Sequence, residues 1–125
     1  MSIDGDGFTS IQYQNANNSV RVSDKFMRAV EAGDEWHLTA RTDGSIVETL
    51  KARKLLRDIA EAAWKCADPG VQYDTTINSW HTLPNTGRIN ASNPCSEYMF
   101  LDNTACNLSS LNLTKFLNDD GNFDI

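Results

Sequence analysis

Residues 93–97 read Asn-Pro-Cys-Ser-Glu, which brings an amide, a thiol and a carboxylate within five positions. Side chains alternate between the two sides of an extended backbone, so Asn93, Cys95 and Glu97 would point the same way if the segment is stretched out. Pro94 favours that geometry, because its ring fixes its own φ and disfavours the helical region for Asn93. We therefore expect the three polar side chains to converge on one small volume, where they can hold a polar substrate and move a proton.

A second thiol, Cys106, follows Cys95, and a third, Cys66, precedes both. An odd number of cysteines fits poorly with a secreted disulfide framework, and no metal-ligand spacing of the Cys-x-x-Cys or His-Glu-x-x-His kind occurs, so no metal site is expected. The residues alone leave two other interpretations of Cys95 and Cys106 open: buried free cysteines in a core, or a local disulfide across a hairpin. Cys66 lies on the apolar face of a predicted amphipathic helix, so we expect a small buried hydrophobe there.

Three longer stretches accompany these residues: Asp-Pro-Gly-Val-Gln-Tyr at 68–73, TINSWHTLPNTGRINASNPCSEYM at 76–99, and CNLSSLNL at 106–113. Together they resemble the adenosylcobalamin-dependent (class II) ribonucleotide reductases, and the resemblance runs from about Asn15 to the last residue. It implies an α/β fold, as part of the ten-stranded α/β barrel of the reductase large chain, incomplete here. Residues 93–97 would form the catalytic loop that enters the centre of that barrel.

The resemblance also implies a role for each residue of the motif. Cys95 corresponds to the thiol that becomes a transient thiyl radical and removes the 3′ hydrogen of the ribose. Glu97 corresponds to the proton acceptor toward the 3′ hydroxyl, and Asn93 to the residue that orients the substrate hydroxyls. The backbone of Asn93, Pro94, Cys95, Ser96 and Glu97 would contact the substrate. Cys106 resembles one of two thiols that reduce the 2′ position and end as a disulfide, its partner lying upstream of this chain.

The function implied by the resemblance is reduction of ribonucleotides to 2′-deoxyribonucleotides, the precursors of DNA. The implied cofactor is adenosylcobalamin, and the implied partners are the ribonucleotide, nucleotide effectors, a thioredoxin-like dithiol, the remaining part of the catalytic chain and a further copy of the complete protein. A class I, metal-dependent large subunit shares the Asn-x-Cys-x-Glu set and stays open as an alternative, although the cysteine spacing favours class II. A non-catalytic piece of a truncated or split protein is the other alternative.

The composition is that of a soluble globular protein, with 40% hydrophobic and 22% charged residues in 125. The net charge of −6 argues against a nucleic-acid surface, and the chain contains no Gly-rich phosphate loop. Nothing approaches the roughly 20 apolar residues of a membrane span, and residues 1–14 read as a loose leader without the features of a signal peptide. We expect residues 1–125 to be a single partial catalytic domain in the cytoplasm.

The pattern of apolar residues and turn signals predicts a series of short elements. Ser23 should cap a helix that stops at Gly33, and a long amphipathic helix should cover Glu48–Ala67. The segment Leu83–Asn90 is expected to be a loop. We predict strands at Val20–Val22, Trp36–Ala40, Val71–Tyr73, Tyr98–Leu101 and Cys106–Leu113, a short helix or turn at Thr75–His81, and turns at Asp43-Gly44 and Asp119-Asp120-Gly121.

Overall fold

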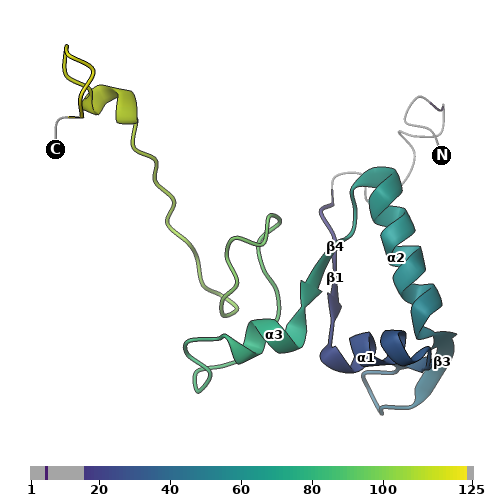
Figure 1. Cartoon of the computed structure of the whole chain (residues 1–125). Helices are drawn as coiled ribbons and strands as arrows, with labels where there is room; N and C mark the ends of the chain where they lie inside the picture. The colour runs from purple at the N-terminus through teal and green to yellow at the C-terminus, as the bar shows by residue number, and fades with distance from the viewer. Residues whose placement is uncertain (1–4, 6–15, 124–125) are drawn as a thin grey trace.

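The computed structural model describes residue 5 and residues 16–123 of the chain. All of the predicted leader at 1–14 except Gly5 lies outside the described residues. The elements, in chain order, are β1 (Ser19–Val22), α1 (Asp24–Ala32), β2 (Glu35–Thr39), β3 (Ile46–Lys51), α2 (Ala52–Cys66), β4 (Gly70–Tyr73), α3 (Asp74–Ser79) and the short 3₁₀ helix η2 (Leu113–Phe116) (Figure 1).

Two separate two-stranded sheets organise these elements. Strands β1 and β4 pair in parallel, with Arg21 opposite Gln72, and β2 and β3 form an antiparallel hairpin. The parallel pair is closed by a connection that contains α1, the hairpin and α2, as a parallel pairing requires. The fold is thus mixed α/β, as predicted, and the described residues form no closed barrel.

Helix α1 begins and ends where its capping residues predict. The Ser23 side chain accepts a hydrogen bond from the Phe26 N–H at 3.3 Å. Gly33 adopts a left-handed φ of 81° and donates its N–H to the Ala29 and Val30 carbonyls, which otherwise have no partner in the helix. The Arg53 guanidinium also donates to the Val30 carbonyl, at 2.8 Å, and so ties α2 to the end of α1.

The helix predicted for Glu48–Ala67 starts later than expected. Residues 46–51 belong to β3, and α2 begins at Ala52. Ile46, Val47 and Thr49 are β-branched, a type of side chain that favours strands. These residues also fit the helical periodicity of α2, but their pairing with β2 makes them a strand.

The hydrophobic core is small and lies between α1, β1 and α2. Val22, Phe26 and Ala52 are buried in it, and the Trp36 ring meets the Phe26 ring edge-on at a centroid distance of 5.1 Å. Leu55 and Leu56 of α2 pack against this cluster. The core therefore fixes β1 relative to the helices, and β1 in turn positions β4.

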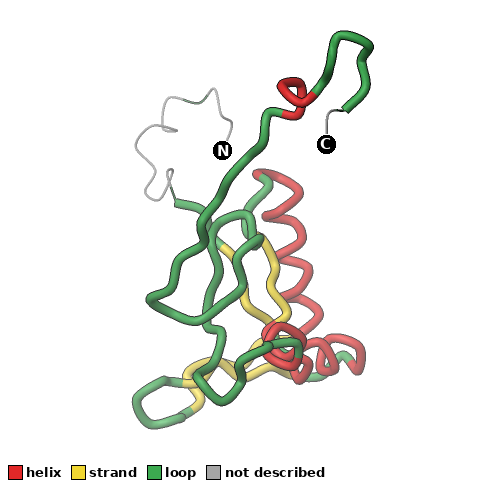
Figure 2. Tube along the Cα trace, turned by 90° about the vertical axis from the view of Figure 1, so that its left-hand side faces the viewer, coloured by secondary structure: helices red, strands yellow, loops and turns green. Residues whose placement is uncertain are grey.

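The two strands predicted after residue 97 are wrong. Residues 98–101 are irregular, and residues 106–112 pair with no strand in the described part of the chain. Figures 1 and 2 show this segment leading away from the rest of the molecule to η2 and a terminal turn. Leu108 and Leu111 are 79% and 73% exposed, so the apolar residues that suggested a strand contact little of the chain itself.

None of the helices that the structure describes has both the length and the apolar character needed to span a membrane.

Candidate active site

The Asn-Pro-Cys-Ser-Glu segment is a tight turn and not an extended strand. The Ser96 N–H donates to the Asn93 carbonyl at 3.1 Å, which closes a β-turn with Pro94 and Cys95 at its two central positions. The expected alternation of Asn93, Cys95 and Glu97 on one side of an extended backbone is therefore wrong. The physical reason is that Asn followed by Pro initiates turns, because proline has the φ that the second turn position needs.

Asn93 supports the turn with its side chain. Its Oδ1 accepts a hydrogen bond from the Tyr98 N–H at 3.0 Å, across the turn. The Ser92 hydroxyl donates to the Asn93 carbonyl at 2.8 Å from the other side. The half-buried Asn93 thus holds the loop with its side-chain oxygen.

Cys95 and Glu97 are presented outward by this turn. Both residues are exposed, and Cys95 is a free thiol. A cavity of about 250 Å³ lies beside the turn and is lined by Asn93 and Pro94 together with Arg21, Gln72 and Ser92, among others. Neither Cys95 nor Glu97 lines this cavity. The side chains of Asn93, Cys95 and Glu97 therefore do not surround one enclosed pocket, and they lie near one another only because the backbone turns there.

A larger cavity of about 480 Å³ lies on another side of the turn. Ser96 lines it together with aromatic and apolar residues of β4, α3 and the loop that follows, including Tyr73, Trp80 and Phe100. His81 also lines it, with its ring edge-on to Phe100 at 5.5 Å. The buried His81 Nε2 has no hydrogen-bond partner among the residues that the structure describes.

The other two cysteines lie apart from the turn. Cys106 is exposed in the extended C-terminal segment and is a free thiol. Cys66, expected to be buried, is instead exposed at the last position of α2, and its thiol donates to the Ala62 carbonyl at 3.1 Å. That prediction is wrong because the apolar stripe of α2 meets the core only as far as its middle, where Ile59 is buried.

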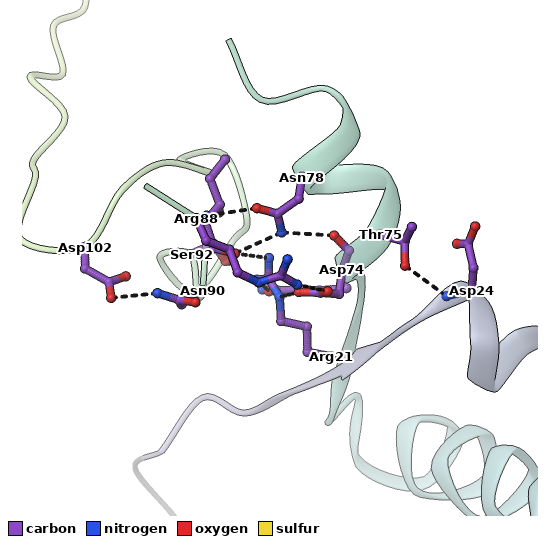
Figure 3. Close-up of polar contacts among 11 residues, drawn as sticks. Arg21, Asp24, Asp74, Thr75, Asn78, Arg88, Asn90, Ser92 and Asp102 are labelled. Atoms are coloured by element: carbon purple, nitrogen blue, oxygen red, sulfur yellow. Dashed lines mark hydrogen bonds and ion pairs between the residues drawn. The ribbon is translucent and has the colours of Figure 1, made fainter. Parts of the chain in front are cut away.

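A polar network behind the turn was not predicted from the sequence. Arg21 of β1 donates to Asp74 at 2.7 Å, to Gln72 Oε1 at 2.9 Å and to the Ile89 carbonyl at 2.8 Å. Arg88 pairs with the second oxygen of Asp74. Figure 3 shows Arg21, Asp74 and Arg88 gathered where β1 passes the start of α3. A signal was present in the sequence: Gln72 is a polar residue at the centre of a predicted buried strand, and buried polar groups need partners.

The charge of Asp74 is fixed by these contacts. The hydrogen bond from the Arg21 guanidinium is the main cause that lowers the pKa of the Asp74 carboxyl, and the bond and charge of Arg88 act in the same direction. Partial burial opposes the shift. Asp74 is thus ionised and binds two arginines. Through Arg21, which also donates to Gln72 and to the Ile89 carbonyl, this network connects β1, β4 and residues 88–89.

A profile of the ribonucleotide reductase barrel domain matches residues 5–125. The chain belongs to the ribonucleotide reductase barrel-domain family. A vitamin B12-dependent ribonucleotide reductase of Streptomyces clavuligerus is 67% identical over 121 residues, which are 97% of this chain and 13% of that protein. One from Rhodopirellula baltica is 55% identical over 125 residues, or 98% of this chain and 12% of that protein.

A vitamin B12-dependent ribonucleoside-diphosphate reductase of Mycobacterium tuberculosis (strain H37Rv) is 42% identical over 103 residues, which are 82% of this chain and 15% of that protein. The chain described here spans about an eighth of the length of the first curated relatives that it matches. The turn and its supporting network lie inside the segment matched to the barrel domain.

The described residues do not by themselves fit a corrin cofactor. The cavity of about 480 Å³ beside the turn has the volume of a site for a drug-sized ligand, a range of about 300–1,000 Å³, and a corrin with its side chains is far larger. Neither histidine presents an accessible ring nitrogen at the turn, because His81 Nε2 is buried and His37 lies in β2 of the hairpin. Among residues 5 and 16–123, no three His, Cys, Asp or Glu side chains gather as a metal site.

Proposed function

We propose that this chain is the part of an adenosylcobalamin-dependent ribonucleotide reductase that carries the substrate-radical thiol, and that the complete enzyme reduces ribonucleotides to 2′-deoxyribonucleotides. The observation that carries the proposal is the exposed, free Cys95 on a hydrogen-bonded turn, inside a segment that matches the reductase barrel domain from residue 5 to 125. The relatives named above are vitamin B12-dependent, which favours this class over the metal-dependent class I.

The proposed chemistry at Cys95 is hydrogen-atom transfer. As a thiyl radical, the Cys95 sulfur takes the hydrogen atom from C3′ of the ribose: an S–H bond forms, a C–H bond breaks, and the unpaired electron moves to C3′. Glu97 accepts the proton of the 3′ hydroxyl. The 2′ hydroxyl takes a proton from one of the two reducing thiols and leaves as water, so that C3′ becomes a carbonyl carbon and the unpaired electron moves to C2′. The Asn93 NH₂ group donates to the substrate hydroxyls while the Asn93 side-chain oxygen stays bonded to the Tyr98 N–H.

Two electrons are needed to complete the reduction, and Cys106 supplies them together with a second thiol outside this chain. One thiol has given its proton to the departing hydroxyl, the other gives a hydrogen atom to C2′, and the two sulfurs join in a disulfide. The electron released by this bond and the proton held by Glu97 return to the 3′ carbonyl group. Cys95 then returns a hydrogen atom to C3′ and is again a thiyl radical. The net change is one ribonucleotide and two thiols converted to one deoxyribonucleotide, one disulfide and water. Cys106 lies on an extended, exposed segment, so a partner and an external dithiol can reach it.

The remaining parts of the proposal concern what surrounds this segment. The ribonucleotide phosphates, nucleotide effectors and the corrin cofactor would be held mostly by the rest of the catalytic chain, because this chain is acidic and has no Gly-rich phosphate loop. A thioredoxin-like dithiol would reduce the disulfide, and the complete enzyme would be a cytoplasmic homo-oligomer.

The test uses a grafted reductase, defined as the Streptomyces clavuligerus protein in which this chain replaces the segment that it matches. With adenosylcobalamin and dithiothreitol, the grafted reductase should form deoxynucleotide. Cys95→Ser should abolish both product and loss of a hydrogen label from C3′, because an O–H bond is too strong to serve as the relay. Cys106→Ser should retain loss of the label and form no deoxynucleotide over repeated turnovers.

Cys66→Ser is the matched control, because Cys66 is also an exposed free thiol in this chain. It should leave turnover unchanged. Loss of turnover in a folded Cys66→Ser protein, with turnover retained in Cys106→Ser, would exchange the roles of these two thiols. Full activity of Cys95→Ser would overturn the proposed function.

A further inference from the structure

Gln72 is a buried polar residue that joins the parallel strand pair to the turn that bears Cys95. Its side chain is 8% exposed, and it stands opposite Arg21 across the β1–β4 pair. Its Oε1 accepts from Arg21, and its Nε2 donates to the Ser92 hydroxyl at 2.7 Å and lies 3.3 Å from the Ser96 hydroxyl. The Gln72 amide thus connects the β1–β4 pair to Ser92 and Ser96, the residues on the two sides of the turn.

The orientation of this amide is determined by its neighbours. An arginine can only donate, so the oxygen of Gln72 must face Arg21 and the NH₂ group must face the serines. Arg21 is itself held by the Asp74 carboxylate and the Ile89 carbonyl. The Gln72 NH₂ group is therefore aimed at the turn by a chain of charged and polar contacts that begins at Asp74.

The two serines transmit this contact to the backbone around Cys95. Ser92 accepts from Gln72 and donates to the Asn93 carbonyl, the same carbonyl that closes the turn with the Ser96 N–H. Ser96 has a left-handed φ of 62°, a conformation that costs a non-glycine residue on the order of 1 kcal/mol or more. The hydrogen bond from Gln72 to the Ser96 hydroxyl helps to hold Ser96 there.

We propose that Gln72 is a positioning residue for the Cys95 thiol, which acts by fixing Ser92 and Ser96 on the two sides of the turn. The inference that Gln72 holds the turn is based on the contacts described above. Only the expected effect on turnover rests on the proposed function. A misplacement of about 1 Å at a reacting group costs on the order of 10²-fold in rate. Loss of the Gln72 contacts should therefore lower kcat while leaving substrate affinity nearly unchanged.

The sharpest variant is Gln72→Glu in the grafted reductase. A glutamate keeps the length of the side chain and can still accept from Arg21, but it has no N–H to offer either serine. Ser92 would have to give up its bond to the Asn93 carbonyl in order to donate to the new carboxylate. Gln72→Met removes both sets of bonds, and it serves as the second variant with a neutral side chain.

Two readouts are needed. Hydrogen exchange, resolved to peptides that cover residues 93–98, reports on the Ser96 and Tyr98 N–H groups that close the turn. Each lost hydrogen bond is worth about 1 kcal/mol, so exchange there should accelerate about five- to thirtyfold in both variants. Steady-state kinetics should show kcat lowered on the order of 10²-fold, with KM changed by less than about threefold.

Asn78→Leu is the matched control. Asn78 belongs to the same network and bonds the backbone of Asp74 and Ile89, but it makes no contact with the turn. Its substitution should accelerate hydrogen exchange around Ile89. Hydrogen exchange at residues 93–98, kcat and KM should stay unchanged.

Each outcome decides the proposal. Unchanged exchange at residues 93–98 in Gln72→Glu overturns it, and so does faster exchange there with an unchanged kcat. If the grafted reductase without further substitution forms no deoxynucleotide, the proposed function fails, and exchange at residues 93–98 alone then decides whether Gln72 holds the turn.

Discussion

Asn93 begins the turn and Glu97 directly follows it, and their surroundings differ. The Asn93 oxygen is occupied by the Tyr98 N–H at 3.0 Å, so this side chain already contributes to the shape of the loop. Glu97 is exposed, and the structure shows it in no hydrogen bond or ion pair with another described residue. At the scale of the residue, Asn93 is therefore partly structural, and the exposed Glu97 is accessible for the proposed proton transfer.

Glu97→Gln should lower turnover of the grafted reductase about 10²- to 10⁴-fold, the usual range for loss of a general base, with little change in nucleotide affinity. Asn93→Ala should weaken binding and also raise hydrogen exchange at Tyr98, because it removes the acceptor of that N–H. The measurements are kcat, KM and nucleotide affinity for both variants. An unchanged rate in Glu97→Gln would show that the carboxylate is not the proton acceptor, without affecting the role of Cys95.

Asp74 gives a prediction that depends on pH. The pKa of its carboxyl is lowered from 3.8 by Arg21 and Arg88, so the folded state binds the proton less tightly than the unfolded chain does. The stabilisation from ionised Asp74 is thus complete above the unfolded pKa and is lost as the pH falls through the lower, folded value. Asp74→Asn should cost about 1–3 kcal/mol at neutral pH, and this difference should shrink below about pH 4.

Urea unfolding of the dilute chain at neutral pH and on both sides of pH 3.8 checks this prediction. Asp58→Asn is the control, because Asp58 pairs with Lys54 on the exposed face of α2 and its loss should change stability little. A difference between Asp74→Asn and the unsubstituted chain that stays constant with pH would rule out the carboxylate as its source.

At the scale of the element, the sequence predicts best where side chain and backbone signals agree. Ser23 and Gly33 bound α1 as expected, and the loop at 83–90 and the turn at Asp119-Asp120-Gly121 lie where the sequence predicts them. The mixed α/β class was likewise predictable, and the assignment of the site to residues 93–97 stays a prediction.

The failures have one physical origin, because a local pattern does not show what the segment pairs with. Residues 48–51 fit the periodicity of α2, yet they pair with β2 across a hairpin. Residues 98–101 and 106–113 are rich in apolar side chains, and the described chain offers no strand beside them. The role of Gln72 depends on residues 20 and 51 positions away, which no local pattern contains.

Ser23→Ala tests the cap that starts α1. The substitution removes the acceptor of the Phe26 N–H and should lower the free energy of unfolding of the dilute chain by about 1 kcal/mol, measured by urea unfolding with circular dichroism. Ser79→Ala removes an exposed hydroxyl that donates to the Thr76 carbonyl within α3 and should have a smaller effect. Equal effects of the two changes would contradict the capping role.

At the scale of the whole molecule, this chain lacks much of what the proposed reaction needs. Each strand of the described sheets pairs with only one neighbour and so leaves one edge open. The chain alone should therefore show no reductase activity with adenosylcobalamin and dithiothreitol, and it should be poorly soluble at high concentration. Deoxynucleotide formation by the purified chain would overturn this expectation, and the grafted reductase serves as the positive control.

The separation of β1 and β4 along the chain also affects the order in which the molecule folds. Arg21 and Gln72 are 51 positions apart, so closing the loop between them costs about 3.5 kcal/mol in entropy, apart from a constant term. The hairpin and the two longer helices involve only near neighbours, and such contacts form early. The turn at residues 93–96 depends on Gln72, and hence on the late pairing, so we expect it to be among the last parts to order. Until then the Cys95 thiol sits on a mobile backbone, open to oxidants and alkylating agents from every direction.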